Sequence, residues 1–304
     1  MDLRQLNALL AVAEHGSFSA AARALHTVQS NVSTHVARLE RELGATLIDR
    51  SSGTLTEEGE AVVARARRIQ TELDALAADV ASLHHEVAGS VRVGVIGTTA
   101  RWLVPPLMES MARTHPKVHV VVLDATTSSL LPQLESGQLD LAVVNLPMND
   151  PDLISTELFE EDHVLIAPRG TDLFGRTTID LVELDQVPLL LEPQGTGFRD
   201  HLDARAAEVG ATLVPQAEVD GMRLLASLAF QGFGPAIVPA SAAPGLISTE
   251  WSRIPVEGLQ RRAVGLARRR RGLPSAPARA LRDVLGEVII TAGAHEPGIH
   301  PTIT

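Results

Sequence analysis

The feature that most limits how this chain can fold is a regular run of apolar residues in its first third. Between residues 62 and 87 the steps from one apolar position to the next alternate between four and three. A mean period near 3.5 is that of a coiled-coil seam, and about 26 helical residues at ~1.5 Å each extend for roughly 40 Å. The repeat predicts a long helix, residues 58 to 89, that pairs with a second copy of the chain; the alternative is a helix on a globular core, which usually shows a wider stripe. The seam consists of Val62, Ala66, Ile69, Leu73, Leu76, Val80, Leu83 and Val87.

Length and composition set the class of protein. With 304 residues, 45% of them hydrophobic and 21% charged, the chain is long enough for two or three compact units of an ordinary globular protein. It contains no cysteine, which excludes disulfides and thiolate metal sites and fits a reducing compartment. The first 25 residues have the pattern of neither a signal peptide nor a membrane-spanning segment. The predicted location is therefore the cytoplasm, with no membrane partner.

The net charge limits the kind of partner. A formal charge of −11 argues against a general binder of polyanions, because non-specific DNA affinity comes mostly from neutralising phosphates. In residues 1 to 56, however, arginines and acidic residues balance. A local nucleic-acid site remains compatible with that neutral segment.

Three short amphipathic helices are predicted in residues 1 to 44. The first begins near Leu3 and stops at Gly16, and a serine, Ser17 or Ser19, can cap the second. The third ends at Gly44, and its apolar stripe can pack against the other two helices. The face that this third helix leaves outside is small, polar and cationic, and can approach base edges and phosphates closely. That face consists of Ser30, Ser33, Thr34, Ala37, Arg38 and Arg41.

Beyond the long helix, the chain alternates strand-like and helical patterns, which predicts an α/β region with mainly parallel sheets. The predicted strands are Val91 to Ile96, Val118 to Leu123, Leu139 to Val144, Val164 to Ala167, Leu189 to Glu192, Gln216 to Val219, Ala236 to Pro239 and Arg262 to Ala267. The predicted helices are Arg101 to Arg113, Leu130 to Glu135, Phe198 to Val209, Met222 to Phe230 and Ala276 to Val288. Residues 291 to 304 have no apolar period and are predicted to form a flexible tail.

Residues 2 to 62 resemble the DNA-binding segment of LysR-type transcriptional regulators. The matching words are LRQLNALLAVAEHGSFSAAARALH, QSNVSTHVARLERELGATLIDR and LTEEGEAVV. The resemblance implies an α/β protein with an N-terminal all-α winged helix-turn-helix, a long dimerising linker helix and a two-lobed effector domain folded like a periplasmic binding protein. The expected parts are residues 1 to 57 for DNA binding, 58 to 89 for the linker, and 90 to 290 for the effector domain. Within the last, residues 90 to 163 with 267 to 290 are expected to form lobe I, and residues 164 to 266 lobe II.

The chain departs from the family pattern in three places. Thr27 and Val28 stand in the reverse of the usual order before the recognition helix, and Val28 cannot cap. Either Thr27 caps one residue early, or the start of this helix is frayed. Ile48 stands where the family usually has Phe, and the wing between Arg50 and Leu55 is short.

A helix-turn-helix needs a recognition helix whose N-terminal half enters the major groove, and cations beside it that hold phosphates. Gln29, Ser30, Ser33 and Thr34 are predicted to meet the first condition. Arg38 and Arg50 are predicted to hold phosphates. The alternative is that all six are ordinary solvated side chains.

Two glycine-threonine turns are candidates for binding the effector. Thr98 and Thr99 follow the first predicted strand and open a helix, where free backbone N–H groups suit an anion such as a carboxylate. Thr196 and Phe198 open a second helix in the same way. By resemblance, Thr126 and Asn145 would line the same cleft between the lobes. The alternative is that such turns only cap helices.

Taken together, these features predict a homo-oligomeric regulator, a dimer or a tetramer, that binds double-stranded promoter DNA. A small effector, with a carboxylate as the candidate class, is the expected ligand, and RNA polymerase is a candidate partner. No cofactor or metal is predicted, and no nucleophile or metal constellation indicates an enzyme. The alternative class is a small-molecule-binding α/β protein or enzyme with an accessory helical domain.

Overall fold

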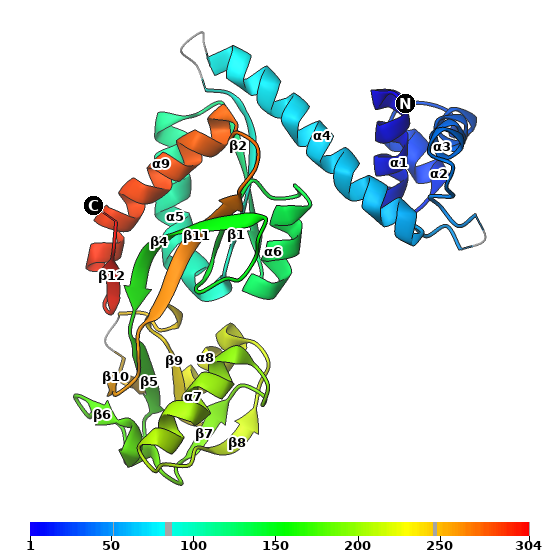
Figure 1. Ribbon diagram of the computed structural model, residues 1–304. Coiled ribbons are helices and arrows are strands. Elements are labelled where there is room, and N and C mark those ends of the chain that lie inside the picture. Colours follow the sequence, from blue (N-terminus) through cyan, green and yellow to red (C-terminus); the bar gives the residue numbers. More distant parts are fainter. Residues whose placement is uncertain (51, 83–86, 246–247, 304) are drawn as a thin grey trace.

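The computed structural model describes residues 1–50, 52–82, 87–245 and 248–303. An N-terminal helical segment is joined by one long helix to two α/β lobes, which follow one another away from that helix (Figure 1). In the part of the chain that is described, no helix is both long and apolar enough to cross a bilayer.

The N-terminal segment contains the three predicted helices, α1 (Leu3–His15), α2 (Phe18–Ala24) and α3 (Gln29–Leu43). Gly16, at φ +70°, ends α1, and the Ser17 hydroxyl caps α2 by accepting from the N–H of Ala20 at 3.2 Å. The helices bury one apolar core, which includes Leu9, Val36 and Leu39. The predicted wing is a single antiparallel bridge between Ile48 and Leu55, and Ser51 lies outside the described residues.

The long helix, α4 (Glu57–Ser82), is capped by Thr56, whose hydroxyl accepts from the N–H of Gly59 at 3.0 Å. Its first turns bury Val63 and Ala66 in the core of the N-terminal segment. Further along, Ala75 and Ala78 are buried on a side of the helix that meets lobe I. One helix therefore joins the DNA-binding segment to the effector domain.

Lobe I is a six-stranded sheet flanked by helices. In spatial order its strands are β12 (Ile299–Pro301), β4 (Leu153–Glu161), β11 (Arg262–Arg269), β3 (Leu141–Asn145), β1 (Gly89–Val95) and β2 (Val118–Asp124). Its helices are α5 (Gly97–Thr114), α6 (Thr127–Glu135), α9 (Ala276–Thr291) and the short η3 (Gly293–His295). Gly94 lets α6 approach β1 closely, because a Cβ there would lie 2.5 Å from the Leu130 side chain.

Lobe II is a second six-stranded sheet. In spatial order its strands are β6 (Ile179–Asp180), β10 (Trp251–Glu257), β5 (His163–Pro168), β9 (Ala236–Pro239), β7 (Pro188–Leu191) and β8 (Val214–Glu218). Its helices are α7 (Gly197–Glu208), α8 (Met222–Phe230), and the short η1 (Leu181–Leu184) and η2 (Ala240–Ala242). The chain enters this lobe between β4 and β5 and leaves it between β10 and β11 (Figure 1).

Three predictions about this region are wrong. The sheets are mixed and not mainly parallel, because β4 and β11, which lead out of and back into lobe I, lie side by side and antiparallel. The second crossing does not fall at residue 267: Arg262 already pairs with Glu161 in lobe I, so residues 262 to 266 belong to that lobe and not to lobe II. The flexible tail is wrong for β12, which pairs with β4 and buries Ile299.

Candidate functional site

The outward face of α3 is available to a ligand. Gln29, Ser30, Thr34 and Arg38 are exposed and Ser33 is half-buried. The Thr34 hydroxyl donates to the carbonyl of Ser30 at 2.7 Å, so only its acceptor lone pairs face outward. In the described parts of the chain, no acidic side chain pairs with Arg38. A cation that the protein does not neutralise is what a phosphate contact requires.

Arg50 lies beside α3, next to the start of α2. Its guanidinium is 5.9 Å from the centre of the Phe18 ring and 3.5 Å from the Glu40 carboxylate. A hollow of about 420 Å³ lies here, lined by Gly16, Ser17, Phe18, Gln29, Ser33, Arg50, Ser52 and Gly53. The structure thus brings Gln29 and Ser33 together with Arg50 at one concave surface.

The start of α3 resolves the alternatives for its cap. Val28 is the N-cap residue and makes no side-chain capping bond. The Thr27 hydroxyl instead accepts from the side-chain amide of Asn31 at 3.0 Å. The helix begins at Gln29, so it is neither capped early by Thr27 nor frayed.

The seam on α4 is open along most of its described length. Ile69, Leu73, Leu76 and Val80 are exposed, Leu76 by 63% and Val80 by 54%. Leu83 lies outside the described residues. A line of large apolar side chains open to solvent on a long helix marks a surface for protein association.

Where the two lobes join, a buried ion pair of lobe I contacts lobe II through η2. The Arg262 guanidinium at the start of β11 pairs with the Glu161 carboxylate at the end of β4, with Nε at 2.7 Å from Oε1, and Glu161 has no exposed surface. Arg262 Nη2 also donates to the Thr98 hydroxyl at 2.9 Å. The second Glu161 oxygen accepts from the N–H of Ser241 in η2 at 2.8 Å. This network ties β4, β11 and α5 of lobe I to η2 beside lobe II.

Three polar atoms near this network have no hydrogen-bond partner although they are buried. They are the hydroxyl of Thr99, Oδ1 of Asn145 and Nδ1 of His163. Burial lowers the pKa of His163 to about 4, with help from the nearby Arg262 charge, so this imidazole is neutral at pH 7. Each buried polar group that stays unpaired costs about 1–3 kcal/mol, which a ligand that pairs with it would recover.

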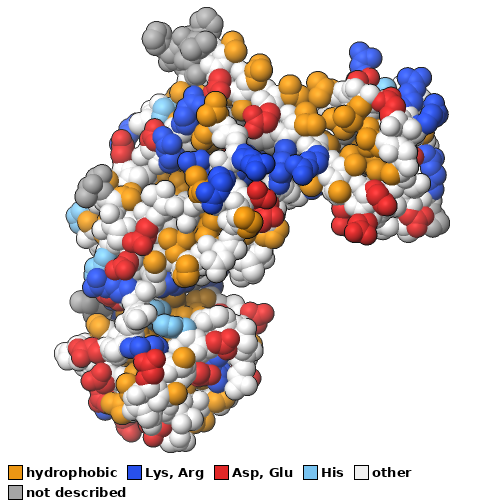
Figure 2. All heavy atoms as spheres, viewed as in Figure 1, with side chains coloured by type: hydrophobic (Ala, Val, Ile, Leu, Met, Phe, Trp, Pro, Cys, Tyr) orange, Lys and Arg blue, Asp and Glu red, His pale blue; other side chains and the backbone are white. Residues whose placement is uncertain are grey.

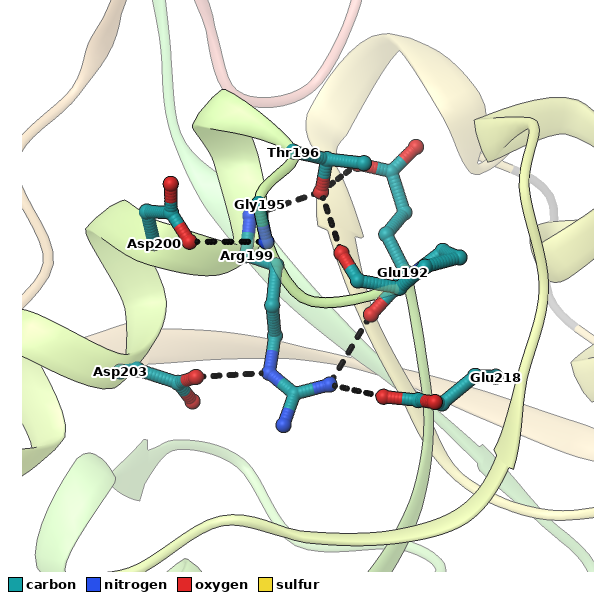
Figure 3. A network of polar contacts seen from close by, with 8 residues as sticks. Glu192, Gly195, Thr196, Arg199, Asp200, Asp203 and Glu218 are labelled. Atoms are coloured by element: carbon teal, nitrogen blue, oxygen red, sulfur yellow. Dashed lines mark hydrogen bonds and ion pairs between the residues drawn. The ribbon is translucent and has the colours of Figure 1, made fainter.

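The turn before α7 is already occupied by groups of the chain itself. The N–H of Gly195 donates to the Asp200 carboxylate at 3.1 Å, and the Thr196 hydroxyl donates to the Pro193 carbonyl at 3.0 Å (Figure 3). Behind them the buried Arg199 reaches Asp203 at 2.9 Å and Glu218 at 3.1 Å (Figure 3). Burial raises the pKa of the adjacent Glu192 carboxyl. The donors of this turn therefore already have acceptors within the chain, and few remain for an anion from solution.

The predicted effector residues fall into two groups. Thr98 contacts the Arg262 network, and Phe198 stacks on His163 at 5.4 Å beside it. Thr126 bonds Ser128 and Ser129, each at 3.0 Å, and Asn145 is tied through its N–H to the Thr127 hydroxyl at 3.1 Å. Figure 2 shows that the molecule is hollowed between the lobes, with histidine side chains at the edge of the hollow.

Sequence reasoning missed Glu161, His163, Ser241 and Arg262. A signal existed for two of them: Glu161 and His163 stand directly before the apolar run of β5, where charged and polar residues become buried. A further groove of about 510 Å³ lies between α5 and α8. At its edge Arg223 of lobe II pairs with Asp124 of lobe I, an ionic link between the lobes.

Comparisons with known proteins agree with this architecture. Residues 3–60 match the family model described as bacterial regulatory helix-turn-helix protein, lysR family, and residues 84–289 match the LysR substrate binding domain. The chain is 33% identical over 301 residues, 94% of each chain, to a "Probable hydrogen peroxide-inducible genes activator" of Mycobacterium leprae. It is 29% identical over 297 residues, 95% of each chain, to the DNA-binding transcriptional dual regulator OxyR of Escherichia coli K12.

Solved structures share the whole fold. A cysteine-to-aspartate variant of full-length OxyR from Pseudomonas aeruginosa superposes with a TM-score of 0.74 at 25% identity, over 96% of this chain and 95% of that one. The regulator CbnR in complex with its target DNA has a TM-score of 0.70 at 24% identity, over 96% of this chain and all of that one, a likeness of fold. Both family models and these full-length matches lead to one conclusion: the chain belongs to the LysR family of bacterial helix-turn-helix transcriptional regulators.

Proposed function

We propose that this regulator responds to a small molecule held between its two lobes at the Arg262 network. The observation that carries the proposal is the set of buried atoms without a partner, the Thr99 hydroxyl, Asn145 Oδ1 and His163 Nδ1. A ligand that opens the lobes and pairs with these atoms removes a desolvation penalty that the empty closed form bears. Ligand binding then favours one arrangement of the lobes, which is the requirement for a response.

The groups that line the cleft indicate which functional groups the proposed ligand carries. Of the two turns predicted to hold an anion, the one before α7 is filled by Asp200 and by the contacts of Thr196. At the start of α5, helix geometry leaves the first N–H groups without intrahelical acceptors, and the Thr99 hydroxyl is unpaired. We propose a small molecule whose acidic group faces the first turn of α5 and whose hydrogen-bond donor meets Asn145 Oδ1.

The signal that the chain senses is proposed to be a bound ligand and not an oxidant acting on a thiol. Several relatives are named for induction by hydrogen peroxide. Reversible oxidation by peroxide proceeds through cysteine thiolates, and this chain has no cysteine. Sulfenic acid and disulfide formation are therefore excluded as its switch.

At the other end of the molecule, α3 is proposed to enter the major groove through Gln29, Ser30, Ser33 and Thr34, with Arg38 and Arg50 on phosphates. A net charge of −11 makes non-specific binding weak, so a dimer on two half-sites is proposed to supply the affinity. The exposed seam of α4 is the proposed dimer surface, and a dimer or tetramer would work on promoter DNA in the cytoplasm, with RNA polymerase as a candidate partner.

The Thr99 hydroxyl provides the test. Thr99→Val keeps the volume and removes the hydroxyl, so the ligand-free protein should gain up to about 1 kcal/mol in the free energy of unfolding. Affinity for the effector, found by thermal-shift screening of small carboxylates and measured by calorimetry, should fall by about 1–3 kcal/mol. Thr99→Ser, which keeps the hydroxyl, is the matched control. Unchanged affinity in a folded Thr99→Val protein would move the ligand to another site.

A further inference from the structure

We propose that Arg68 and Thr71 of α4 are positioning residues: through them α6 passes the state of the effector cleft to the DNA-binding segment. The inference rests on the proposed function, because it assumes that the cleft between the lobes is where the signal arrives. Its basis is that the first end of the short helix α6 contacts the effector cleft, and the second end contacts the linker helix α4.

The first end of α6 is part of the cleft. Thr126 is its N-cap residue, and the Thr127 hydroxyl accepts from the N–H of Asn145, at the end of β3, at 3.1 Å. Asn145 in turn carries one of the buried atoms that lack a partner. A ligand that bonds Asn145 therefore acts on the residue to which the first turn of α6 is tied.

The second end of α6 holds the linker helix. Arg68 Nε donates to the carbonyl of Glu135, the last residue of α6, at 2.8 Å. The Thr71 hydroxyl shares its one proton between the carbonyl of Arg67 on its own helix, at 3.0 Å, and the carbonyl of Gly137, at 3.2 Å. Figure 2 shows Lys and Arg side chains gathered where α4 crosses lobe I, and Figure 1 shows α6 below that crossing.

These contacts are built into α6 and are not loose surface pairs. The last carbonyls of a helix have no intrahelical donor, so a cation there is favoured by both the hydrogen bond and the helix dipole. Arg269 of β11 donates to the neighbouring carbonyl of Leu134 at 3.0 Å, and Arg68 donates to the carbonyl of Glu135. Arg68 thus completes the C-terminal capping of a helix in another domain.

Between its two ends, α6 is a short helix with Pro132 inside it, held to lobe I by buried leucines. It has nine residues, about 13 Å at ~1.5 Å per residue, and Leu130 and Leu134 have no exposed surface. Gly94 lies directly beneath Leu130 on β1. A shift or tilt at Thr127 therefore displaces the carbonyls at residues 135 and 137, and with them the donors on α4.

A double-mutant cycle on operator binding tests the inference without knowledge of the effector. The probe is a DNA duplex selected from a random library by the full-length protein. Thr127→Val removes the tie between α6 and Asn145, and Arg68→Met removes the donor on α4. Thr127→Val should change operator affinity by at least about fivefold in the parent protein and by less than about twofold in the Arg68→Met background.

Control variants separate positioning from stability. Arg68→Lys keeps a donor and should restore the response to Thr127→Val, whereas Arg65→Met, an exposed arginine on the same helix, should leave that response unchanged. Because the chain has no cysteine of its own, Thr71→Cys with Gly137→Cys supplies the only thiols, and non-reducing electrophoresis separates the intended disulfide within one chain from one between two copies; a Cβ on Gly137 would lie 3.5 Å from the Thr71 hydroxyl oxygen. Placed in the Arg68→Met background, the oxidised pair ties α6 to α4 covalently and should restore the response to Thr127→Val, and reduction should remove it again.

The outcomes are distinct. An equal effect of Thr127→Val in both backgrounds, or no effect in either, would overturn the role of Arg68, as would an oxidised double-cysteine Arg68→Met protein that stays unresponsive to Thr127→Val. Failure of the parent protein to select any duplex would instead contradict the proposed function. Operator binding that is intact but unresponsive to Thr127→Val therefore identifies failure of the relay alone.

Discussion

The N-terminal segment with α4 and the two lobes carry their functional groups in opposite ways. In the former the polar side chains of α3 and the seam of α4 lie on the surface, over a core that is almost wholly apolar. In the lobes the polar groups are internal: Glu161, His163 and Arg199 are buried. The hydrogen bonds of Glu161 and Arg199 are made to other groups of the protein. In the N-terminal segment and α4, a substitution can remove function without loss of stability. In the lobes, each change of a polar side chain alters both function and stability.

The largest effect is expected from charges placed on the seam of α4. Leu73→Asp with Leu76→Asp would place two carboxylates from each copy in a desolvated helix pair, which should weaken association by more than about 5 kcal/mol. Each single chain should stay folded, because both positions are exposed. Sedimentation at low concentration measures the assembly, and Ala77→Asp, exposed on α4 but off the seam, is the control. Unchanged assembly would place the main interface elsewhere.

The next largest effect is expected in the lobes. Glu161→Gln keeps the shape but leaves the Arg262 charge without its counter-charge, which should cost about 3–5 kcal/mol of stability. Both tryptophans of the chain, Trp102 and Trp251, lie in the lobes, so their fluorescence in a urea titration reports on this region alone.

The exposed pair Arg176–Glu183 gives the matched control. Glu183→Gln should cost much less than Glu161→Gln, because solvent screens that pair. If the two substitutions cost the same, water reaches Arg262, and the contrast between buried and surface polar groups would not hold there.

The same contrast governs what could be predicted from the sequence. Local signals specify the N-terminal segment: helical spacing, Ser17 as a cap and Gly16 as a stop are each read within one turn of chain. β9 and α8 were predicted with their bounds for the same reason. β4 was missed because LISTELFEE carries three glutamates and owes its extended form to pairing with β11 and β12.

The cleft depends on long-range contacts that no spacing encodes. Glu161 and Arg262 are 101 positions apart, and Thr98 and Arg262 are 164 apart. The sequence marked Thr98 and Thr99 because a glycine-threonine turn opens a helix, but the same signal at Thr196 belongs to a turn that Asp200 closes. Local pattern cannot distinguish an open turn from an occupied one.

A smaller effect is expected on the surface of α3. Arg38→Ala should reduce the slope of log affinity against log salt by about one for each half-site, on operator and random DNA alike. Because Arg38 is exposed and unpaired among the described residues, the free energy of unfolding should change by less than about 0.5 kcal/mol. Gln29→Ala should instead alter which sequence is preferred. An unchanged salt slope would remove Arg38 from the interface.

The smallest effect, none at all, is expected from hydrogen peroxide. Without cysteine, the chain has no thiolate to form a sulfenic acid or disulfide, so operator affinity should be the same before and after treatment. The peroxide-named relative from Mycobacterium leprae, treated in parallel, serves as the comparison. Intact mass detects the remaining route, a gain of about 16 Da for each methionine sulfoxide, with the exposed Met108 among the five candidates. A change in operator affinity that appears with that mass gain, and that methionine sulfoxide reductase reverses, would show that methionine oxidation replaces the thiol as a switch. An unchanged affinity would leave the cleft between the lobes as the place where this regulator receives its signal.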